Sequence, residues 1–241
     1  IKNMPSIPKW INDAFENLLS SKFPLVEVTN TEYFSPSVKK ISLKGDFRKL
    51  DFQIGYYIEF RVNDTEYRRY MVSHGDSEKG FMEIIAHLHG EAPAVKYLHE
   101  LTKGDKAIVI PPRGNKWYNE SVEKQLIFGD ETSLSLACSF LPVLKQNKHQ
   151  FQFYFELDEK NKEVPELLGL ENYTVFPKNG SFRNEKWVSN LPIFKTADWQ
   201  NANYILTGNV KSVQTFRKVL KNTFTGKIFS KGFWLEGKNG L

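Results

Sequence analysis

Two different patterns of hydrophobic residues follow one another along this 241-residue chain, and the change between them limits the folds it can adopt. Between residues 25 and 114, short β-rich segments are separated by Gly, Asn, Asp and Pro. From residue 125 onward, β-rich segments alternate with helical ones. Closely spaced strands are typical of an antiparallel barrel or sandwich, whereas alternating strands and helices are typical of a parallel, doubly wound sheet. The sequence therefore predicts two domains.

The first part of the chain is predicted to be mostly β structure, with two short helices. One helix, with Pro8 in its first turn, is expected at residues 8–19, and another, entered through Pro93, at residues 92–101. Because no helix separates the early strands, the pattern favours a small antiparallel barrel or a sandwich. The expected strands are residues 25–34, 37–45, 56–63, 66–74, 80–90 and 101–114.

The second part has the strand–helix order of a sheet covered by helices on both faces. Ligands of such sheets bind at the carboxyl ends of strands, near the point where the strand order reverses. We assign residues 1–118 to the β domain and residues 119–241 to the α/β domain, with the boundary near residues 115–123. The expected strands are residues 126–130, 149–157, 172–177, 202–209 and 231–237, and the expected helices are residues 132–146, 163–170 and 210–222.

Composition restricts the partners and the compartment. The net charge is +5, but the 33 basic residues are interleaved with 28 acidic ones. With no arginine-rich block we expect no nucleic acid, and an anionic small ligand fits the charge as well. No apolar run reaches the length of a membrane helix and no basic-then-apolar leader is visible, so we expect no membrane insertion. The lone cysteine, Cys138, indicates a reducing compartment, so we expect a cytoplasmic protein, and we expect a monomer.

One predicted strand of the β domain carries residues suited to a phosphate-containing ligand. Arg68 and Tyr70 lie two residues apart in the strand at 66–74, so their side chains face the same side. An arginine can pair with a phosphate, and a tyrosine can pack against a flat ring. The alternative is a solvated basic edge beside a core tyrosine.

The turn after the next strand offers a second phosphate site. Gly90 and Pro93 lead into the short helix, whose first backbone N–H groups have no partner within the helix and could bind a pyrophosphate. His87 and His89 share a strand face just before this turn. No third ligand stands at a metal-binding spacing, so we expect no metal site.

Two strand ends of the α/β domain each carry a glycine. Residues 129–132 read GDET, where Asp130 or Thr132 can cap a helix and Gly129 lets a ligand approach the backbone. Gly208 stands at the end of a later strand, again before a helix. A shared nucleotide cleft is the functional interpretation of the pair, and simple helix capping is the alternative.

Taken in order, six segments resemble the motifs of the siderophore-interacting proteins, flavin-dependent ferric-siderophore reductases of the ferredoxin reductase superfamily. That family reads R-x-Y-T, H-G-x-G-P-A-S, G-P-x-G, G-D-E-T, G-E before a helix and Y-W-x-x-G near the end. This sequence reads RRYM, HGEAPAV, PRG, GDET, GN and FWLEG between residues 68 and 237. Each match is weak alone, and the six in order make the resemblance specific.

The resemblance implies a six-stranded flavin barrel followed by a nicotinamide nucleotide domain, a ferredoxin reductase-like fold. It implies that Arg68 binds a phosphate of FAD and that Tyr70 packs against the flavin or its ribityl chain. The implied FAD-binding residues are Arg68, Tyr70, Met71, Val72, His87, His89, Gly90, Pro93, Ala94 and Val95. The implied NAD(P)H-binding residues are Gly129, Asp130, Glu131, Thr132, Glu156, Gly208 and Asn209.

Four residues depart from the family pattern. Met71 replaces a hydroxyl residue, and Val95 replaces a serine in the pyrophosphate turn, so two hydroxyl groups are missing. Ala92 replaces a glycine, which raises the question of whether a positive φ is needed there. Asn209 replaces a glutamate. These departures predict weaker flavin binding than the family pattern would give.

The resemblance also implies an activity. NADH or NADPH would reduce the flavin, the flavin would reduce the Fe(III) of a ferric siderophore, and no side chain would act as acid or base. A basic rim would attract the anionic siderophore, and its candidates are Arg113, Lys116, Lys227 and Lys231. Two alternatives remain: a flavin reductase that passes electrons to a protein partner, and a flavin- or siderophore-binding protein without turnover.

The sequence leaves the electron donor open. An acidic residue after the second strand of a dinucleotide fold favours the free ribose hydroxyl of NADH, whereas Arg or Lys suits the 2′-phosphate of NADPH. The second strand here ends in ELDEK, residues 156–160, which contains charges of both signs.

Overall fold

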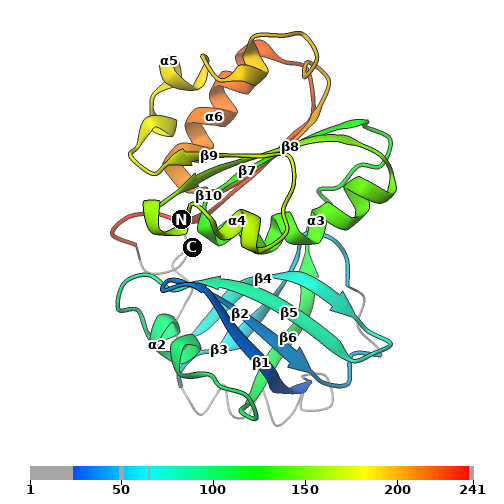
Figure 1. Ribbon diagram of the computed structural model, residues 1–241, viewed down its shortest axis with the longest axis vertical. Helices are drawn as coiled ribbons and strands as arrows, with labels where there is room; N and C mark the ends of the chain where they lie inside the picture. Colours follow the sequence, from blue (N-terminus) through cyan, green and yellow to red (C-terminus); the bar gives the residue numbers. More distant parts are fainter. Residues whose placement is uncertain (1–23, 49–51, 65, 239–241) are drawn as a thin grey trace. The chain divides into compact units, whose positions relative to one another are not determined.

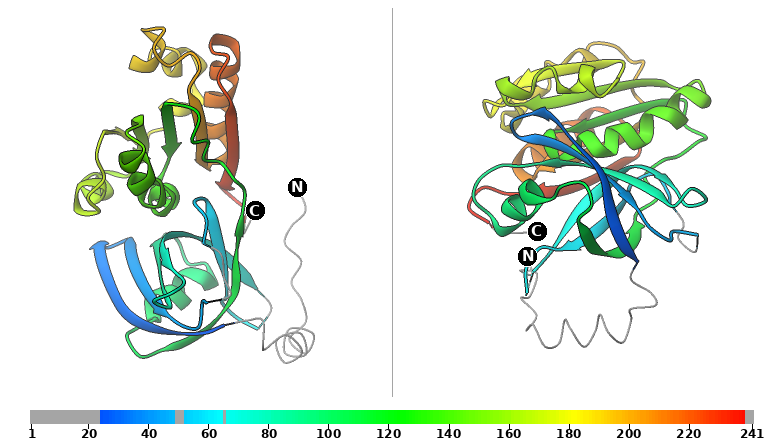
Figure 2. Two further views of the ribbon diagram at one scale, coloured as in Figure 1. Left: turned by 90° about the vertical axis from the view of Figure 1, so that its right-hand side faces the viewer. Right: turned by 60° about the horizontal axis from the view of Figure 1, so that its bottom comes forward.

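The computed structural model describes residues 24–48, 52–64 and 66–238. The chain forms two compact units, which divide between Lys116 and Trp117. Figures 1 and 2 show a barrel of strands in the first unit and a sheet with helices in the second. The helix expected at residues 8–19 lies outside the described residues. Within the described part of the chain, no helix combines the length and the apolar character needed to cross a membrane.

The first unit is a closed, six-stranded antiparallel barrel. The strand order around it is β1-β2-β5-β4-β3-β6, and pairing of β6 with β1 closes the ring. This pairing selects the barrel over the sandwich and confirms the fold that the resemblance implied. The elements are β1 (Leu25–Ser35), β2 (Val38–Lys44), β3 (Tyr56–Arg61), β4 (Tyr67–Asp76), β5 (Phe81–His87), α2 (Pro93–Glu100) and β6 (Lys106–Gly114).

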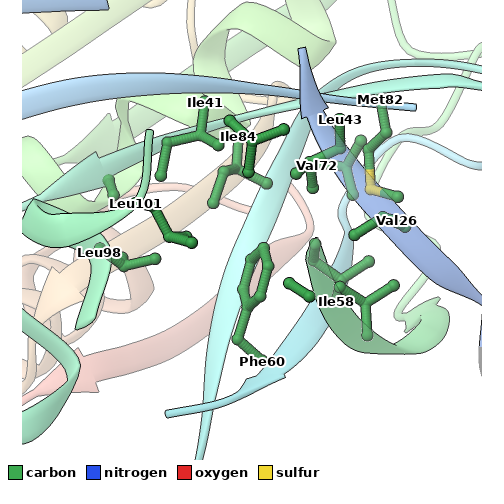
Figure 3. Packing of buried hydrophobic residues seen from close by; sticks show 14 of the residues in the cluster. Val26, Ile41, Leu43, Ile58, Phe60, Val72, Met82, Ile84, Leu98 and Leu101 are labelled. Carbon is green, nitrogen blue, oxygen red and sulfur yellow. The ribbon is translucent and has the colours of Figure 1, made fainter. Parts of the chain in front are cut away.

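Alternate residues of the strands fill the barrel, as the two-residue period of a strand requires. Ile41 and Leu43 of β2 and Ile84 of β5 are fully buried. Figure 3 shows them in one cluster with Phe60 of β3, and with Leu98, which α2 adds. Burying each such side chain stabilises the fold by about 1.5–3 kcal/mol, so the helix is packed onto the barrel by its own apolar residues.

A buried lysine also connects α2 to the barrel. Lys39 of β2 is 1% exposed, and its ammonium group donates to the carbonyls of Leu98 (2.8 Å), His99 (3.1 Å) and Leu101 (2.6 Å). The last carbonyl groups of a helix receive no hydrogen bond from an N–H group of the same helix. The Lys39 ammonium supplies the missing donor at the end of α2. Burial lowers the pKa of Lys39, and the carboxylate of Asp105 acts in the opposite direction. Three donors therefore meet three carbonyls at the negative end of the helix dipole.

Replacing Lys39 by methionine should destabilise the first unit by about 2–3 kcal/mol, because the new side chain keeps the volume and leaves buried carbonyls unsatisfied. Chemical denaturation followed by circular dichroism measures the loss. Lys44→Met, at the exposed end of the same strand, is the matched control and should change stability by less than about 0.5 kcal/mol. Equal stability of the two variants would show that water replaces the lysine at no cost.

The second unit is a five-stranded parallel sheet in the order β11-β10-β7-β8-β9. The chain builds β7, β8 and β9 toward one edge and then returns to place β10 and β11 on the other side of β7. The strand order thus reverses between β7 and β10, which confirms the doubly wound sheet. The strands are β7 (Lys124–Gly129), β8 (Gln150–Leu157), β9 (Tyr173–Pro177), β10 (Asn203–Asn209) and β11 (Ile228–Trp234).

Helices cover both faces of this sheet. Figure 1 shows α3 and α4 on one face and α5 and α6 on the other. Four single 3-10 turns interrupt the connections, at Glu131–Ser133, Glu159–Asn161, Ser181–Arg183 and Pro192–Phe194. The helices are α3 (Leu134–Gln146), α4 (Val164–Leu167), α5 (Glu185–Val188) and α6 (Val210–Thr223).

The segment between β9 and β10 differs most from the sequence prediction. It holds α5 and two of the 3-10 turns, none of which was predicted. Phe182, Val188 and Ile193 from this segment are buried in the cluster that packs α6 on the sheet. Each of these elements is a single turn, too short for a hydrophobic period to be visible, so only packing defines them. The last strand also begins earlier than predicted, at Ile228, because it pairs with Tyr204 of β10.

Candidate functional site

In the barrel unit, β4 places Arg68 and Tyr70 on one strand face, as predicted. Tyr70 is half-buried, and its ring meets that of Phe60 edge-on at 5.9 Å. Burial raises the pKa of Tyr70, so its hydroxyl stays protonated. The Arg68 guanidinium donates to the Tyr67 carbonyl (2.9 Å) and lies 3.3 Å from a Glu66 carboxylate oxygen. These two bonds orient Arg68 and leave part of its five-donor fork available to a phosphate.

The neighbouring predicted residues of β4 are enclosed. Val72 is 6% exposed and belongs to the barrel core, and Met71 is 8% exposed on the opposite strand face. Their side chains are therefore used in packing. Any contact of theirs with a ligand would have to come from the backbone.

The turn before α2 answers the question raised by Ala92. This residue has φ −64° and ψ 149°, an ordinary extended conformation, so alanine fits without strain. Gly90 is the residue with positive φ (+73°), and a Cβ there would meet nothing within 4 Å. Pro93 begins α2, and the N-cap residue Ala92 offers no side-chain acceptor to the first N–H groups of the helix. The turn thus keeps the one glycine that its backbone requires.

The other predicted residues around α2 lie on both sides of this turn. Val95 donates its N–H to the Ala92 carbonyl (2.8 Å), so this amide is used within the first turn, and Ala94 is buried. His87 is half-buried and His89 is exposed, with ring centroids 4.9 Å apart.

Two arginines share one buried carboxylate on the barrel. Glu59 is 4% exposed, and its Oε1 accepts from Arg69 (2.7 Å) and from Arg113 (2.8 Å). Both guanidinium groups lie over the Tyr57 ring, at 5.2 Å and 5.8 Å from its centroid. Glu59 and Arg69 are cross-strand partners of β3 and β4. One carboxylate and two guanidinium groups leave this arginine cluster (Tyr57, Glu59, Arg69 and Arg113) with a net positive charge.

The remaining basic candidates are not part of this cluster. Lys116 is exposed at the end of the first unit. Lys227 and Lys231 belong to the second unit, where the ammonium of Lys227 lies 4.7 Å from the Phe229 ring centroid. Of the predicted rim residues, Arg113 belongs to the arginine cluster.

In the sheet unit, Asp130 joins three elements at the carboxyl ends of the strands. It is 1% exposed. Its Oδ1 accepts from the N–H and the hydroxyl of Thr132 (2.9 Å and 2.5 Å), and its Oδ2 accepts from the Asn209 N–H (2.8 Å) and the Trp234 indole N–H (2.5 Å). Burial raises the pKa of Asp130. This carboxylate therefore caps the GDET turn and ties it to the ends of β10 and β11.

Glu131 is used in the same way on the other side of the turn. It is fully buried and accepts from the N–H of Asp158 (2.8 Å), the amide of Asn161 (3.0 Å) and the ammonium of Lys178 (2.7 Å). Although burial acts to lower it, the carboxylates of Asp130 and Glu131 raise the pKa of Lys178. Glu131 thus fixes the ends of β8 and β9 relative to the turn after β7.

The other predicted nucleotide residues also shape this edge. A Cβ on Gly129 would lie 2.1 Å from that of Ser133, and one on Gly208 (φ +99°) would lie 2.7 Å from the Asp130 carboxyl carbon. Asn209 caps α6 by accepting from Lys211 and Ser212, and Glu156 accepts from the Ser212 hydroxyl (2.8 Å). Both glycines are therefore required by close packing within the protein.

The tryptophan of the last strand is held by charge on two sides. The indole N–H of Trp234 donates to Asp130, and the ammonium of Lys178 lies 5.0 Å from its ring centroid. A cation over a ring face and a carboxylate at its N–H together fix the ring at the edge of the sheet. Nearby, Arg183 pairs with Glu236.

No protein-family model and no curated protein sequence matches the chain. Its structure is similar to solved ones. A siderophore-interacting protein from Acinetobacter baumannii is 18% identical, with a TM-score of 0.72 over 90% of this chain and 92% of that one. A siderophore utilization protein from T. fusca is 20% identical, with a TM-score of 0.72 over 91% and 95%. A ferredoxin NADP+ reductase from Neisseria gonorrhoeae, solved with bound FAD and NADP, is 14% identical, with a TM-score of 0.69 over 88% and 98%.

These matches each cover both units in one chain. The chain has the ferredoxin reductase fold. The likeness to siderophore-interacting proteins that the six motifs indicated is confirmed as a likeness of fold. At these identities the ferredoxin reductase fold leaves substrate and cofactor to be argued from the residues.

The predicted site residues did not include Lys178 and Trp234 of the second unit or Arg69 of the first. Lys178 directly follows β9 and Trp234 ends β11, so both stand at carboxyl strand ends, where ligands of α/β sheets bind. Trp234 also stands in the FWLEG motif. Arg69 follows Arg68 on the opposite face of β4, and only its pairing with β3 brings it to Glu59.

Proposed function

We propose that this protein is a flavin-dependent NAD(P)H oxidoreductase that reduces the Fe(III) of ferric siderophores, as a cytoplasmic monomer. One observation carries the proposal. The helix start of the barrel unit, at Ala92, has no side-chain cap, whereas at two strand ends of the sheet unit the side chains of Asp130 and Asn209 cap the 3-10 turn after β7 and the start of α6. An uncapped start suits a resident anionic cofactor, and capped starts suit a nucleotide that comes and goes.

The residues of the barrel unit fit FAD. The open space above Gly90 admits a pyrophosphate close to the backbone, and Ala92 needs no strained conformation. Arg68 supplies a positive charge for a phosphate. Tyr70 keeps its hydroxyl protonated, and its ring can pack on the flavin or its ribityl chain. The amide of Val95 already donates to the Ala92 carbonyl, so it is not a donor for the pyrophosphate.

The protein's own task in this reaction is placement. FAD, when bound, takes two electrons from NADH or NADPH and passes them singly to two Fe(III) ions. Arg68 and Tyr70 hold and orient this cofactor in the barrel unit. In the sheet unit, the hydrogen bonds that the buried carboxylates of Asp130 and Glu131 accept would hold the GDET turn in shape for the nicotinamide nucleotide. Fe(II) then leaves, because oxygen-rich chelators bind it far more weakly than Fe(III).

The arginine cluster is our proposed collector of the ferric siderophore. Glu59 orients both guanidinium groups, and Arg113 is 52% exposed at its side chain. A net positive, partly exposed group attracts an anionic chelate and raises its rate of encounter. Lys116, Lys227 and Lys231 remain candidates for the surrounding rim.

Reconstitution with FAD tests the proposal. The purified protein should turn yellow and, with NADH or NADPH, should produce Fe(II) from ferric siderophores, measured with a chromogenic Fe(II) chelator. Arg113→Ala should raise KM for an anionic ferric siderophore more than it lowers kcat, while Lys106→Ala, at the exposed start of the same strand, is the control.

Three other outcomes would each contradict the proposal. A yellow protein that is reduced by NAD(P)H but transfers no electrons to iron would be a flavin reductase for another acceptor, such as a protein partner. A yellow protein that neither donor reduces would be a flavin-binding protein without turnover. A colourless protein that does not bind FAD would remove the flavin from the proposal altogether.

A further inference from the structure

The carboxyl end of β8 carries an acidic residue that the site described above uses only through its backbone. Asp158 follows β8 directly, and β8 pairs in parallel with β7, the strand that leads into the GDET turn. The Asp158 N–H donates to the buried carboxylate of Glu131 (2.8 Å). Two strand ends are thereby locked together, and the position of Asp158 relative to the turn is fixed.

The Asp158 carboxylate itself remains accessible. Its side chain is 43% exposed, and it lies 4.0 Å from the ammonium of Lys178. That ammonium is 2.7 Å from Glu131 and 16% exposed at its side chain, so the buried glutamate already neutralises it. Asp158 thus presents a negative charge to solvent that its neighbouring lysine balances only in part.

The charged residues that follow Asp158 in the chain do not cancel its negative charge at the end of β8. In the turn after β8, Glu159 pairs with Lys162 at 2.6 Å, so these two charges balance each other. Lys160 is exposed in the same turn, three residues beyond the end of β8, and is the cation that a phosphate there could use. The sequence showed both signs in this segment, and the structure separates a carboxylate fixed at the strand end from a lysine farther along the turn.

We infer that Asp158 binds the adenosine ribose of the electron donor and selects NADH over NADPH. This inference rests on the proposed function, because it assumes that a nicotinamide dinucleotide binds at the carboxyl ends of the strands in the sheet unit. A carboxylate after the second strand of a dinucleotide fold accepts hydrogen bonds from the ribose hydroxyls. The 2′-phosphate of NADPH would instead bring two like charges into contact in a partly buried position.

Direct binding to the full-length protein tests the inference without any turnover. Isothermal titration with NAD+ and with NADP+ gives the two affinities, and we expect NAD+ to bind at least about tenfold more tightly. Asp158→Ala should weaken NAD+ binding and bring the two affinities to within about threefold, because it removes both the ribose acceptor and the repulsion. Glu159→Ala, on the same turn, should leave the ratio as in the unaltered protein.

A second variant, Lys160→Ala, tests whether Lys160 binds the 2′-phosphate of NADP+. If Lys160→Ala lowers NADP+ affinity more than NAD+ affinity, and the unaltered protein binds NADP+ as tightly as NAD+, then Lys160 reads a 2′-phosphate and the inference is wrong. It is also wrong if Asp158→Ala leaves the ratio of affinities unchanged. Circular dichroism of each variant checks that the substitution has not unfolded the second unit.

Measurements of nucleotide binding and of iron reduction together distinguish failure of the inference from failure of the proposed function. Selective NAD+ binding by a protein that reduces no iron would overturn the function and keep the inference. Iron reduction with NADPH preferred would keep the function and overturn the inference. If neither nucleotide binds at millimolar concentration and neither reduces the FAD-loaded protein, both are wrong.

Discussion

Asp130→Asn is expected to destabilise the sheet unit by about 2–4 kcal/mol. The side chain keeps its size but has one acceptor oxygen in place of two, so its amide nitrogen would face either the Thr132 N–H or the N–H groups of Asn209 and Trp234. In either orientation at least one donor would lose its acceptor and the other bonds would lose their charge, and each unsatisfied buried group costs about 1–3 kcal/mol. Urea denaturation followed by circular dichroism measures the shift of the midpoint.

Two further variants make this result specific. Asp198→Asn, at an exposed aspartate of the same unit, is the matched control and should leave the midpoint unchanged. Trp234→Phe removes one donor, so it should cost less in the Asp130→Asn background than alone, as expected for contacting residues in a double-mutant cycle. Additive effects would mean that Asp130 and Trp234 act independently, which would contradict the hydrogen bond between them.

Arg68→Ala is expected to weaken FAD binding by about 10–100-fold. The variant removes a charge-assisted contact with a phosphate, which contributes about 1.5–3 kcal/mol, and about 1.4 kcal/mol corresponds to each factor of ten. Arg68→Lys should fall between the two, because lysine keeps the charge and loses the planar fork. Titration of the apoprotein with FAD, followed by flavin fluorescence, gives the affinities.

The control for Arg68 lies in the same unit. Arg48 pairs with Asp46, and its side chain is 77% exposed, so Arg48→Ala removes a charge without touching the barrel core. It should change FAD affinity by less than about twofold. If Arg68→Ala binds FAD as well as Arg48→Ala does, Arg68 does not belong to the flavin site.

Much of the fold could be predicted from the sequence, because long strands and helices have a visible hydrophobic period. Most barrel strands, α3, α6 and the central strands of the sheet were predicted close to their observed bounds, whereas β6 begins at Lys106 instead of the predicted residue 101. The segment between β9 and β10 was not, since its single-turn elements are too short to show a period. Barrel and sandwich could not be distinguished either, because the pairing of β6 with β1 joins residues far apart in the chain.

For the candidate site residues too, local patterns could be recognised in the sequence, whereas burial and long-range contacts could not. Arg68 and Tyr70 were proposed from their two-residue spacing, and the GDET turn from its place after a strand. The structure adds that Asp130 and Glu131, chosen as nucleotide contacts, are buried and bonded within the protein. Burial depends on neighbours such as Trp234, which lies more than a hundred residues away, and no local pattern reports it.

The sequence by itself determined the order of the longer strands and helices, the expectation of two domains and the motifs that resemble a flavin reductase family, because period, turn residues and motif order are local properties of the chain. Only the tertiary structure decided which of those motif residues can face a ligand. It turned Asp130 and Glu131 into the internal ties of the sheet edge and left Asp158 exposed. It also brought Arg69 and Arg113 onto Glu59. The physical reason is that exposure and charge pairing arise from contacts between strands that the chain brings together only on folding.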